Sequence, residues 1–338
     1  MSTEEWPPPV LAGLRAAAAL SLTGRYAGPG SQAAEGLRAW AADRGVDLRV
    51  EDDRSDPDRT GGLYRRLAGE CDLLFGPYGS GPTRAAARAL AGSPAVMWNH
   101  GGAATEEGAA RVVSVIGPAG RYWTGLAPVL AGAGVPLERV AILHAPTGFG
   151  RATADGAVAS LATAGAEPLL LASFDEATAG AAAAEALAAG AAAVVGCGRI
   201  EDDLALGDAL AGREVAVGLI VCGIALAPEH LGDAVAGWFG PAVWWPEGPE
   251  PPIALPSGVD YPAAQAMAAG LIAERALAVA GSADPEGLWA AALRLRTQTF
   301  LGPFAVDATG AQTGLAPRLV RWERSGGTLV RTQAWPAP

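Results

Sequence analysis

Lysine is absent from this 338-residue sequence, and all 24 of its basic residues are arginines. No run of five basic residues occurs, and the formal net charge is −11. Nucleic acids and anionic membrane surfaces attract clusters of basic side chains, so this charge balance argues against both as partners. Half of the residues are apolar and only 17% are charged, which allows a large core and two domains of ordinary size.

Cysteine and histidine are also scarce, with three residues of each. An odd number of widely separated cysteines in apolar contexts indicates buried thiols rather than a disulfide framework. The histidines lack metal-ligand spacing among themselves and with the cysteines. We therefore expect no metal and no other cofactor. The residues concerned are Cys71, Cys197, Cys222, His100, His144 and His230.

Two targeting signals are missing as well. The chain opens with MSTEEWPPP, which is acidic and rich in proline, whereas a signal peptide begins with a basic segment. The run AAAALSL that follows is short and predicts a first buried strand. No stretch approaches the roughly 18 apolar residues of a membrane span. The sequence as written therefore predicts a soluble chain without an export signal.

What the sequence does contain is a regular alternation of short apolar strands with helices. Examples are the strands LLFGP, RVAILH, PLLLASF and AVGLIVCG, each next to an amphipathic or alanine-rich helix. This rhythm predicts an α/β fold with parallel sheets covered on both faces, in doubly wound units. It restarts near Gly117–Arg121, which indicates two Rossmann-like lobes. Towards the end, two long helices precede two strand pairs with turns at Thr309–Gly310 and Gly326–Gly327.

One turn is a candidate anion site. Residues 76–83 read GPYGSGPT and lie between an apolar strand and a helix, but Pro82 stands where a nucleotide-binding loop has its lysine. A glycine turn at a helix N-terminus can bind a carboxylate through backbone N–H groups alone. A plain tight turn and a degenerate nucleotide loop are the alternatives.

Several segments, taken in order, resemble one family. LTGRYAGPGSQAAEGLRAW, VEDDRSDP, LLFGPYGSGPT, HGGAAT, LHAPTGFGR and LGPFAVDATGAQTG are similar to motifs of type I periplasmic binding proteins, the branched-chain amino acid and amide group. The resemblance covers residues 18 to 325. It implies a solute-binding protein of an ABC importer with three interlobe crossings, which closes on a small ligand in an interlobe cleft. The implied lobes are 1–118 with 248–312, and 119–247 with 313–338.

The resemblance also implies a ligand site. Backbone and hydroxyl groups of the GPYGSGPT turn would bind the ligand's carboxylate, the AAT turn would bind its carboxylate and amine, and an aromatic residue of TGFGR would stack on it. The threonine of AAT also suits a helix N-cap, and the aromatic residue also suits the core. The matching positions are Tyr78, Gly79, Ser80, Ala103, Ala104, Thr105 and Phe149.

Two departures from the family change the expected ligand. The acid that pairs with an amino acid's ammonium is missing near Ile224, and Gly198 and Arg199 replace a tyrosine. Either Glu201 or Asp202 serves instead, or the ligand has no ammonium and Arg199 binds a carboxylate. Aromatic residues near the expected cleft favour an aromatic or branched aliphatic acid or amide. These are Trp98, His100, Tyr122, Trp123, Trp244, Trp245 and Tyr261.

Enzyme signatures are missing: the sequence has no GxSxG, CxxC or HExxH motif, and its glycines after the first strand are wrongly spaced for a dinucleotide site. We read the acid pairs Asp52–Asp53 and Asp202–Asp203 as capping groups. The expected partners are a small-molecule ligand and an ABC permease complex. Family resemblance implies an extracytoplasmic location, whereas the missing leader favours the alternative, a cytoplasmic ligand sensor of the same fold.

Overall fold

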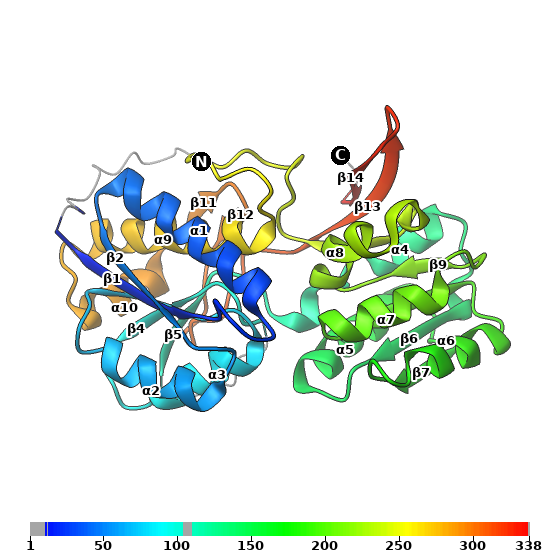
Figure 1. Cartoon of the computed structure of the whole chain (residues 1–338), viewed down its shortest axis with the longest axis horizontal. Coiled ribbons are helices and arrows are strands. Elements are labelled where there is room, and N and C mark those ends of the chain that lie inside the picture. Colours follow the sequence, from blue (N-terminus) through cyan, green and yellow to red (C-terminus); the bar gives the residue numbers. More distant parts are fainter. Residues whose placement is uncertain (1–10, 12, 104–109, 337–338) are drawn as a thin grey trace. The chain divides into compact units, whose positions relative to one another are not determined.

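The computed structural model describes residues 11, 13–103 and 110–336 (Figure 1). The chain forms two compact units. Unit 1 comprises the described residues up to Pro118 together with Pro249–Leu315, and unit 2 comprises Ala119–Gly248 together with the described residues from Ala316. The lobe boundaries expected from the sequence follow residues 118, 247 and 312. Those of the two units follow residues 118, 248 and 315.

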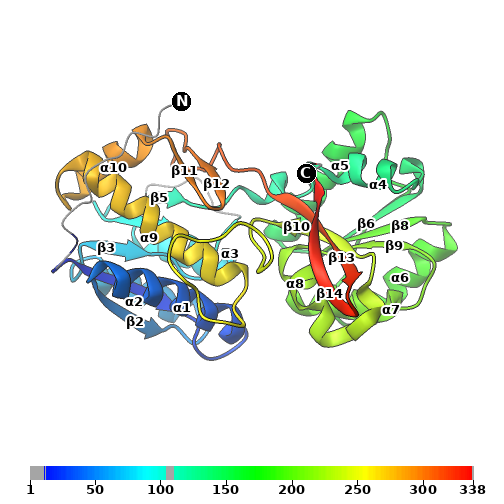
Figure 2. The same cartoon turned by 90° about the horizontal axis from the view of Figure 1, so that it is seen from above.

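The main sheet of unit 1 is parallel throughout, with the strand order β2-β1-β3-β4-β5. Helices α2 and α3 pack together on one face, and helices α1 and α9 pack together on the other (Figures 1 and 2). The elements are β1 Arg15–Leu20, α1 Ala27–Arg44, β2 Asp47–Asp52, α2 Pro57–Leu67, β3 Leu73–Phe75, α3 Ser80–Ala89, β4 Val96–Asn99, β5 Arg111–Ser114, α9 Tyr261–Ala280, α10 Pro285–Arg294, β11 Thr297–Thr299 and β12 Gly302–Phe304.

Unit 2 has a larger, mixed sheet with the order β14-β13-β10-β9-β8-β6-β7. Strands β7, β6, β8, β9 and β10 are parallel to one another. The hairpin β13–β14 lies at one edge of the sheet, where β13 pairs antiparallel with both β10 and β14. The elements are α4 Leu126–Gly132, β6 Val140–His144, α5 Gly148–Thr163, β7 Leu170–Ser173, α6 Ala179–Ala188, β8 Ala193–Cys197, α7 Ile200–Leu210, β9 Ala216–Gly218, α8 Val221–Leu231, β10 Phe239–Ala242, β13 Arg318–Ser325 and β14 Thr328–Trp335.

Hydrophobic burial explains why these segments take these conformations. Strands such as β1, β3 and β8 are buried almost throughout, as expected for parallel strands covered on both faces. The two helices α1 and α9 approach closely because Gly36 has no side chain: a Cβ there would lie 2.0 Å from the Ala263 carbonyl oxygen. The prediction of an α/β fold with parallel central sheets is confirmed.

Two local predictions need correction. The segment AVGLIVCG is a strand only over Ala216–Gly218, and helix α8 begins at Val221. The turn at Thr309–Gly310 joins a single bridge, Val306 to Gln312, rather than two strands, whereas the turn at Gly326–Gly327 does join the hairpin β13–β14. A turn conformation needs only a few local contacts, whereas a hairpin of two strands is marginally stable unless it joins further strands or packs against a helix.

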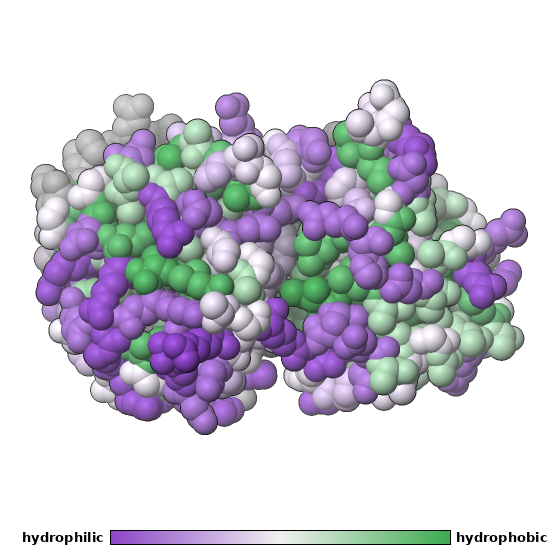
Figure 3. Space-filling view, in the orientation of Figure 1, coloured by the Kyte–Doolittle hydropathy of each residue, from purple (hydrophilic) through white to green (hydrophobic). Residues whose placement is uncertain are grey.

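The expectation about membrane-spanning length was also wrong. Helix α9 has 20 residues and a mean hydropathy of 1.2, which satisfies the length and composition of a span. However, 72% of its most apolar 18-residue stretch is buried inside the protein, which is typical of a core helix. On the face drawn in Figure 3, apolar residues form separate patches among polar ones. Among the described residues, Leu169 and Leu171 are the exposed large hydrophobic side chains.

Candidate functional site

The strand order of unit 1 reverses between β1 and β3, and a helix follows each of these strands. Helix α1 begins after Tyr26 and helix α3 begins after Gly79. Neither helix has a side-chain cap at its N-terminus, and neither has an acidic residue in its first turn. Since helix N-termini have unpaired N–H groups and a partial positive charge, this edge of unit 1 is suited to an anion.

Gly79 gives the predicted turn its shape. Its φ of 94° lies in the range that favours glycine, and its N–H donates to the Gly101 carbonyl at 2.9 Å. The Thr83 hydroxyl donates to the Gly79 carbonyl, also at 2.9 Å. The resemblance implies that the Gly79 N–H binds a ligand. In the structure this N–H instead connects the GPYGSGPT turn to the turn after β4. Ser80, the first residue of α3, is half-buried and remains the predicted donor.

The second predicted turn follows β4. The Asn99 side chain accepts hydrogen bonds from the amides of Gly101 and Gly102 and donates one to the Gly102 carbonyl. This fixes the backbone that leads to Ala103, which is buried. Ala104 and Thr105, also predicted to contact the ligand, lie outside the described residues, so both remain predictions.

Three tyrosines surround the start of α3. The rings of Tyr26 and Tyr78 meet edge-on with centroids 6.1 Å apart, and the ring of Tyr261 lies 6.4 Å from that of Tyr78. The hydroxyls of Tyr78 and Tyr261 are hydrogen-bonded to each other. The guanidinium of Arg25 lies 5.6 Å from the centre of the Tyr26 ring. The sequence analysis missed Tyr26 and Arg25, although both belong to the family-like segment LTGRYAGPG.

Two predicted aromatic residues are interior side chains. Trp98 and His100 are fully buried, and among the residues that the structure describes neither the indole nitrogen of Trp98 nor either ring nitrogen of His100 has a partner at good hydrogen-bond geometry. Burial lowers the pKa of His100 to about 4, and the backbone of Gly76 opposes this shift only in part. His100 is therefore neutral near pH 7. Direct ligand contact would require either side chain to become exposed.

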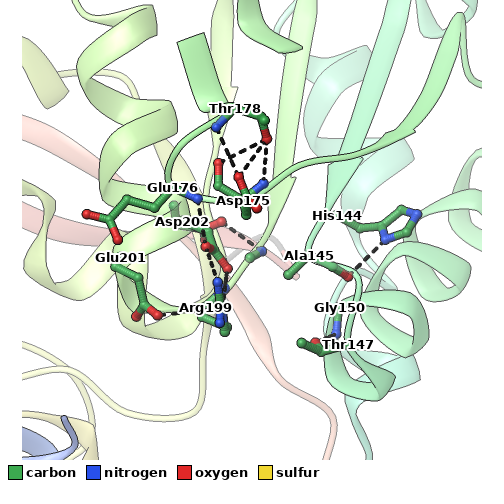
Figure 4. Close-up of polar contacts among 12 residues, drawn as sticks. His144, Ala145, Thr147, Gly150, Asp175, Glu176, Thr178, Arg199, Glu201 and Asp202 are labelled. Carbon is green, nitrogen blue, oxygen red and sulfur yellow. Dashed lines mark hydrogen bonds and ion pairs between the residues drawn. The ribbon is translucent and has the colours of Figure 1, made fainter. Parts of the chain in front are cut away.

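In unit 2 the strand order reverses between β6 and β8, and the helices that follow these two strands, α5 and α7, each have a polar side chain of unit 2 at the N-terminus (Figure 4). The Thr147 hydroxyl accepts a hydrogen bond from the Gly150 amide at the start of α5. At the start of α7 the Asp202 carboxylate accepts one from the Arg199 amide. The reading of Asp202 as a capping group is confirmed. This edge of unit 2 already has its own groups at both helix N-termini.

The Arg199 guanidinium points at Asp202 (Figure 4). Its Nε lies 2.6 Å from one carboxylate oxygen of Asp202 and its second nitrogen lies 2.8 Å from the other. Asp202 also accepts the Glu176 amide and is fully buried, while Glu201 lies 3.5 Å from the Arg199 Nε. The fork that the sequence assigned to a ligand carboxylate is thus engaged by a carboxylate of the chain itself. A ligand carboxylate at Arg199 would therefore have to share the guanidinium with Asp202 or replace Asp202.

Phe149 and Tyr122, both predicted contacts, lie together in unit 2. Their rings meet edge-on with centroids 6.2 Å apart, and Phe149 is half-buried at the start of α5. Tyr122 is buried, which raises its pKa well above the usual value. The remaining tryptophans named from the sequence are buried core residues, namely Trp123, Trp244 and Trp245.

The position of the missing family acid also needs correction. Ile224 lies inside α8 and is fully buried, and the strand before this helix ends at Gly218. An acid nevertheless reaches the loop between them: the Asp203 carboxylate accepts the Ile220 amide at 2.8 Å. The sequence analysis placed Asp203 only among capping residues. Asp203 and Ile220 are 17 residues apart in the chain, so no local sequence pattern indicates their hydrogen bond.

A cavity of about 320 Å³ lies elsewhere in unit 1, beside Arg84 and Arg88 of α3 and Asp307. Of the predicted ligand residues that the structure describes, only Ala103 lines it. The cavity is lined by Ala103 and Ala110, the two residues on either side of the undescribed segment 104–109. We therefore assign this cavity no role. Within the described residues, no group of three His, Cys, Asp or Glu side chains could hold a metal ion.

Comparison with solved structures shows the same fold. A solute-binding protein of an ABC transporter from R. palustris, in complex with 4-hydroxybenzoate, has a TM-score of 0.83 at 18% identity, with 95% of each chain covered. Another from R. palustris, in complex with benzoate, has a TM-score of 0.75 at 18% identity, over 95% of this chain and 96% of the other. A leucine-binding protein from Thermotoga maritima has a TM-score of 0.78 at 15% identity, over 94% and 97%.

No curated protein matches the sequence. The family model described as "Periplasmic binding protein" matches residues 14–328, which is most of the chain. The parallel sheets and the order of the turns described above agree with that match. The protein therefore belongs to the type I periplasmic binding protein family.

Proposed function

We propose that this protein is an extracytoplasmic solute-binding protein that captures a small aromatic or branched aliphatic carboxylate for an ABC importer. One observation supports this most: two uncapped helices, α1 and α3, begin where the strand order of unit 1 reverses, beside three tyrosines. Helix N-termini favour a carboxylate, and tyrosine rings favour an apolar or aromatic body next to it.

The charges of the two units support a carboxylate bound to unit 1. In unit 2 the first turn of α7 already contains Glu201, Asp202 and Asp203. A ligand carboxylate near this turn would meet like charges, whereas the first turns of α1 and α3 contain no acid. Ser80 supplies a hydroxyl next to the α3 amides. We assign the ligand carboxylate to the Ser80 end of α3, and the contacts that the resemblance implies for Ala103, Ala104 and Thr105 are part of this proposal.

The acids of unit 2 argue against an amino acid. An ammonium group needs a carboxylate partner when it leaves water. Asp202 is fully buried and binds Arg199 and the Glu176 amide, and Asp203 is fully buried and binds two amides. Both carboxylates are therefore engaged. We propose that the ligand lacks an ammonium and that Phe149 and Tyr122 contact its body.

The neighbours with similar folds agree with an aromatic acid. Besides 4-hydroxybenzoate and benzoate, one was solved with 3,4-dihydroxybenzoic acid. Tyr78 belongs to the proposed carboxylate turn, and its hydroxyl is hydrogen-bonded to that of Tyr261. They offer polar atoms to a hydroxyl on the ligand ring, so we propose that hydroxylated benzoates bind more tightly than benzoate.

A thermal-shift screen followed by calorimetry tests the ligand class. The screen contains benzoate, 4-hydroxybenzoate, 3,4-dihydroxybenzoate, a branched aliphatic acid, the matching amides, leucine and valine. A ligand at 100 times its dissociation constant adds about 2.7 kcal/mol to the free energy of unfolding. We expect the acids to raise the melting temperature and the amino acids to leave it unchanged. If leucine or valine gave the largest shift, the assignment of a ligand without an ammonium would be wrong.

The importer role is tested separately. The purified protein, loaded with a ligand from that screen, is added to its ABC permease in liposomes, and ATP hydrolysis is measured. Stimulation only in the presence of ligand is the expected result. A protein that binds ligand, forms a stable dimer and leaves every permease unaffected would instead be the ligand sensor that the sequence left open.

A further inference from the structure

Tyr26 differs from the other two tyrosines at the start of α3. Tyr78 and Tyr261 are buried and their hydroxyls bond each other, whereas Tyr26 is half-buried. A Cβ on Gly79 would lie 3.6 Å from the Tyr26 Cζ, the ring carbon that bears the hydroxyl. Within the part of the chain that the structure describes, this hydroxyl makes no hydrogen bond. A phenol with its hydrogen-bonding capacity unused therefore lies against the residue that precedes α3.

The backbone of Tyr26 is held on both sides. Its amide donates to the Ser55 hydroxyl oxygen at 3.0 Å, and its carbonyl accepts the Gly30 amide of α1 at 2.8 Å. The Ser55 hydroxyl in turn donates to the Thr23 carbonyl at 3.0 Å. One side chain from the loop after β2 thus bridges two points of the loop between β1 and α1 and fixes the segment that carries the Tyr26 ring.

Ser55 reaches this position through a strained turn. Arg54 and Ser55 both have a φ of 59°, which residues other than glycine rarely adopt. The Asp52 carboxylate accepts the Arg54 amide, and the Asp53 carboxylate accepts the Ser55 amide. Gly24 lets the two loops approach, because a Cβ there would lie 2.7 Å from the Arg54 carbonyl oxygen. Such strain persists only where the surroundings hold it, and it gathers at ligand sites.

We propose that the Tyr26 hydroxyl donates a hydrogen bond to the ligand carboxylate and that Ser55 is the positioning residue that holds Tyr26 for this contact. The inference rests on the proposed function, because it uses the carboxylate assigned to the Ser80 end of α3. A hydroxyl bonds an ionised oxygen more strongly than a neutral one. Since the strained turn fixes the Tyr26 backbone before the ligand arrives, less conformational freedom is lost on binding.

Tyr26→Phe tests the hydroxyl contact. Calorimetry with benzoate and with 4-hydroxybenzoate should show the affinity falling about tenfold for both ligands, because both have the carboxylate and the lost bond is to a charged group. This pattern differs from that expected for the Tyr78 and Tyr261 hydroxyls, which we have assigned to a hydroxyl on the ligand ring. Unchanged affinity for both ligands, or a loss for 4-hydroxybenzoate alone, would overturn the proposal.

Ser55→Gly tests the positioning role, and Arg54→Gly is its matched control. The two residues have the same φ, so both variants relieve the left-handed strain, but only Ser55→Gly removes the hydroxyl that binds the Tyr26 amide. Arg54 is exposed, and about 0.5 M salt screens the charge lost with it. We expect the benzoate affinity to fall about fivefold in Ser55→Gly and to stay unchanged in Arg54→Gly. An equal result in the two variants would contradict the positioning role.

A double variant separates positioning from a general effect on stability. If Ser55 acts through the Tyr26 hydroxyl, Ser55→Gly should lower benzoate affinity less than about twofold once Tyr26→Phe is present. An undiminished loss there would show that Ser55 acts on the loop alone. If no acid binds the wild type, the proposed function fails, and hydrogen exchange of the Tyr26 amide still tests Ser55. Faster exchange in Ser55→Gly than in Arg54→Gly is then expected, and equal exchange would refute the positioning role.

Discussion

The two units differ most at the point where each strand order reverses. In unit 1 the helices after the two central strands, α1 and α3, have neither a side-chain cap nor an acid in the first turn. In unit 2 the corresponding helix α5 is capped by Thr147, and the first turn of α7 contains three acids, of which Asp202 accepts the Arg199 amide. Two regions of the same fold class thus use the same helix ends differently.

This difference indicates a division of labour. An uncapped helix N-terminus is electrostatically incomplete and gains from an external anion, whereas a capped one does not. The edge of unit 1 can therefore recognise a ligand carboxylate. The edge of unit 2 already has acids of its own in the first turn of α7, so it gains less from a ligand carboxylate.

The largest expected effect comes from giving unit 1 the charge that unit 2 already has. Gly81→Asp places a carboxylate at the second residue of α3, where a Cβ meets nothing within 4 Å. Two like charges about 4 Å apart repel by about 4 kcal/mol near a protein surface. After screening we expect the affinity for 4-hydroxybenzoate to fall by about 100-fold, measured by calorimetry.

Unit 2 provides the control for this substitution. Gly180 is likewise the second residue of its helix, α6, and has open space around its Cα. Gly180→Asp adds the same charge and should leave the affinity unchanged. Each variant should gain a few tenths of a kcal/mol in stability from the helix dipole. Equal loss of binding in the two variants would show that net charge, and not the α3 terminus, controls affinity.

A smaller effect concerns the pH dependence of the free energy of unfolding, which should have opposite signs for Asp203 of unit 2 and Asp52 of unit 1. The raised pKa of Asp203 means that its contribution to the free energy of unfolding is complete below about pH 4 and is lost as the pH rises through about 7. Asp203→Asn should remove a fall on the order of 4 kcal/mol between these values, seen in urea unfolding at a series of pH values. A wild-type stability that rises over the same range would contradict this.

Asp52 of unit 1 should show the opposite sign. Burial alone would raise its pKa, but hydrogen bonds from the Thr23 hydroxyl and from the amides of Leu22, Thr23 and Arg54 lower it. Its contribution to stability is therefore present above its ordinary pKa and is lost as the pH falls through the lowered value. Asp52→Asn should reduce stability at neutral pH and flatten acid unfolding, measured by circular dichroism.

The smallest effect concerns the tyrosine pair of unit 1. Removing either hydroxyl, in Tyr78→Phe or Tyr261→Phe, should lower the affinity for 4-hydroxybenzoate about fivefold, the value of roughly one hydrogen bond, and leave benzoate affinity unchanged. The double variant should add little, because the two hydroxyls bond each other. Tyr122→Phe in unit 2 is the control. A loss of equal size for both ligands would assign the hydroxyl pair to stability rather than to specificity.

Much of this could be predicted from the sequence. Apolar strands alternating with helices gave the α/β class, since period and burial are local properties. The glycines and Ser80 of GPYGSGPT marked the turn before α3 because a left-handed φ restricts the residue type. The role of Gly79 was misjudged, because its amide bonds Gly101, a contact that local pattern does not reveal. Arg199 was likewise misjudged, because charge alone does not show that Asp202 engages its fork.

By itself, then, the sequence determined the fold class, the positions of the turns and the net negative charge without a basic run, all of which follow from residue type and spacing. Only the tertiary structure decided which helix ends are capped and which carboxylates are buried. Those properties depend on pairs such as Asp203 with Ile220 and Tyr78 with Tyr261, which are far apart in the chain and meet only after packing. Burial sets the sign of a charge's effect, and burial is a property of the folded chain.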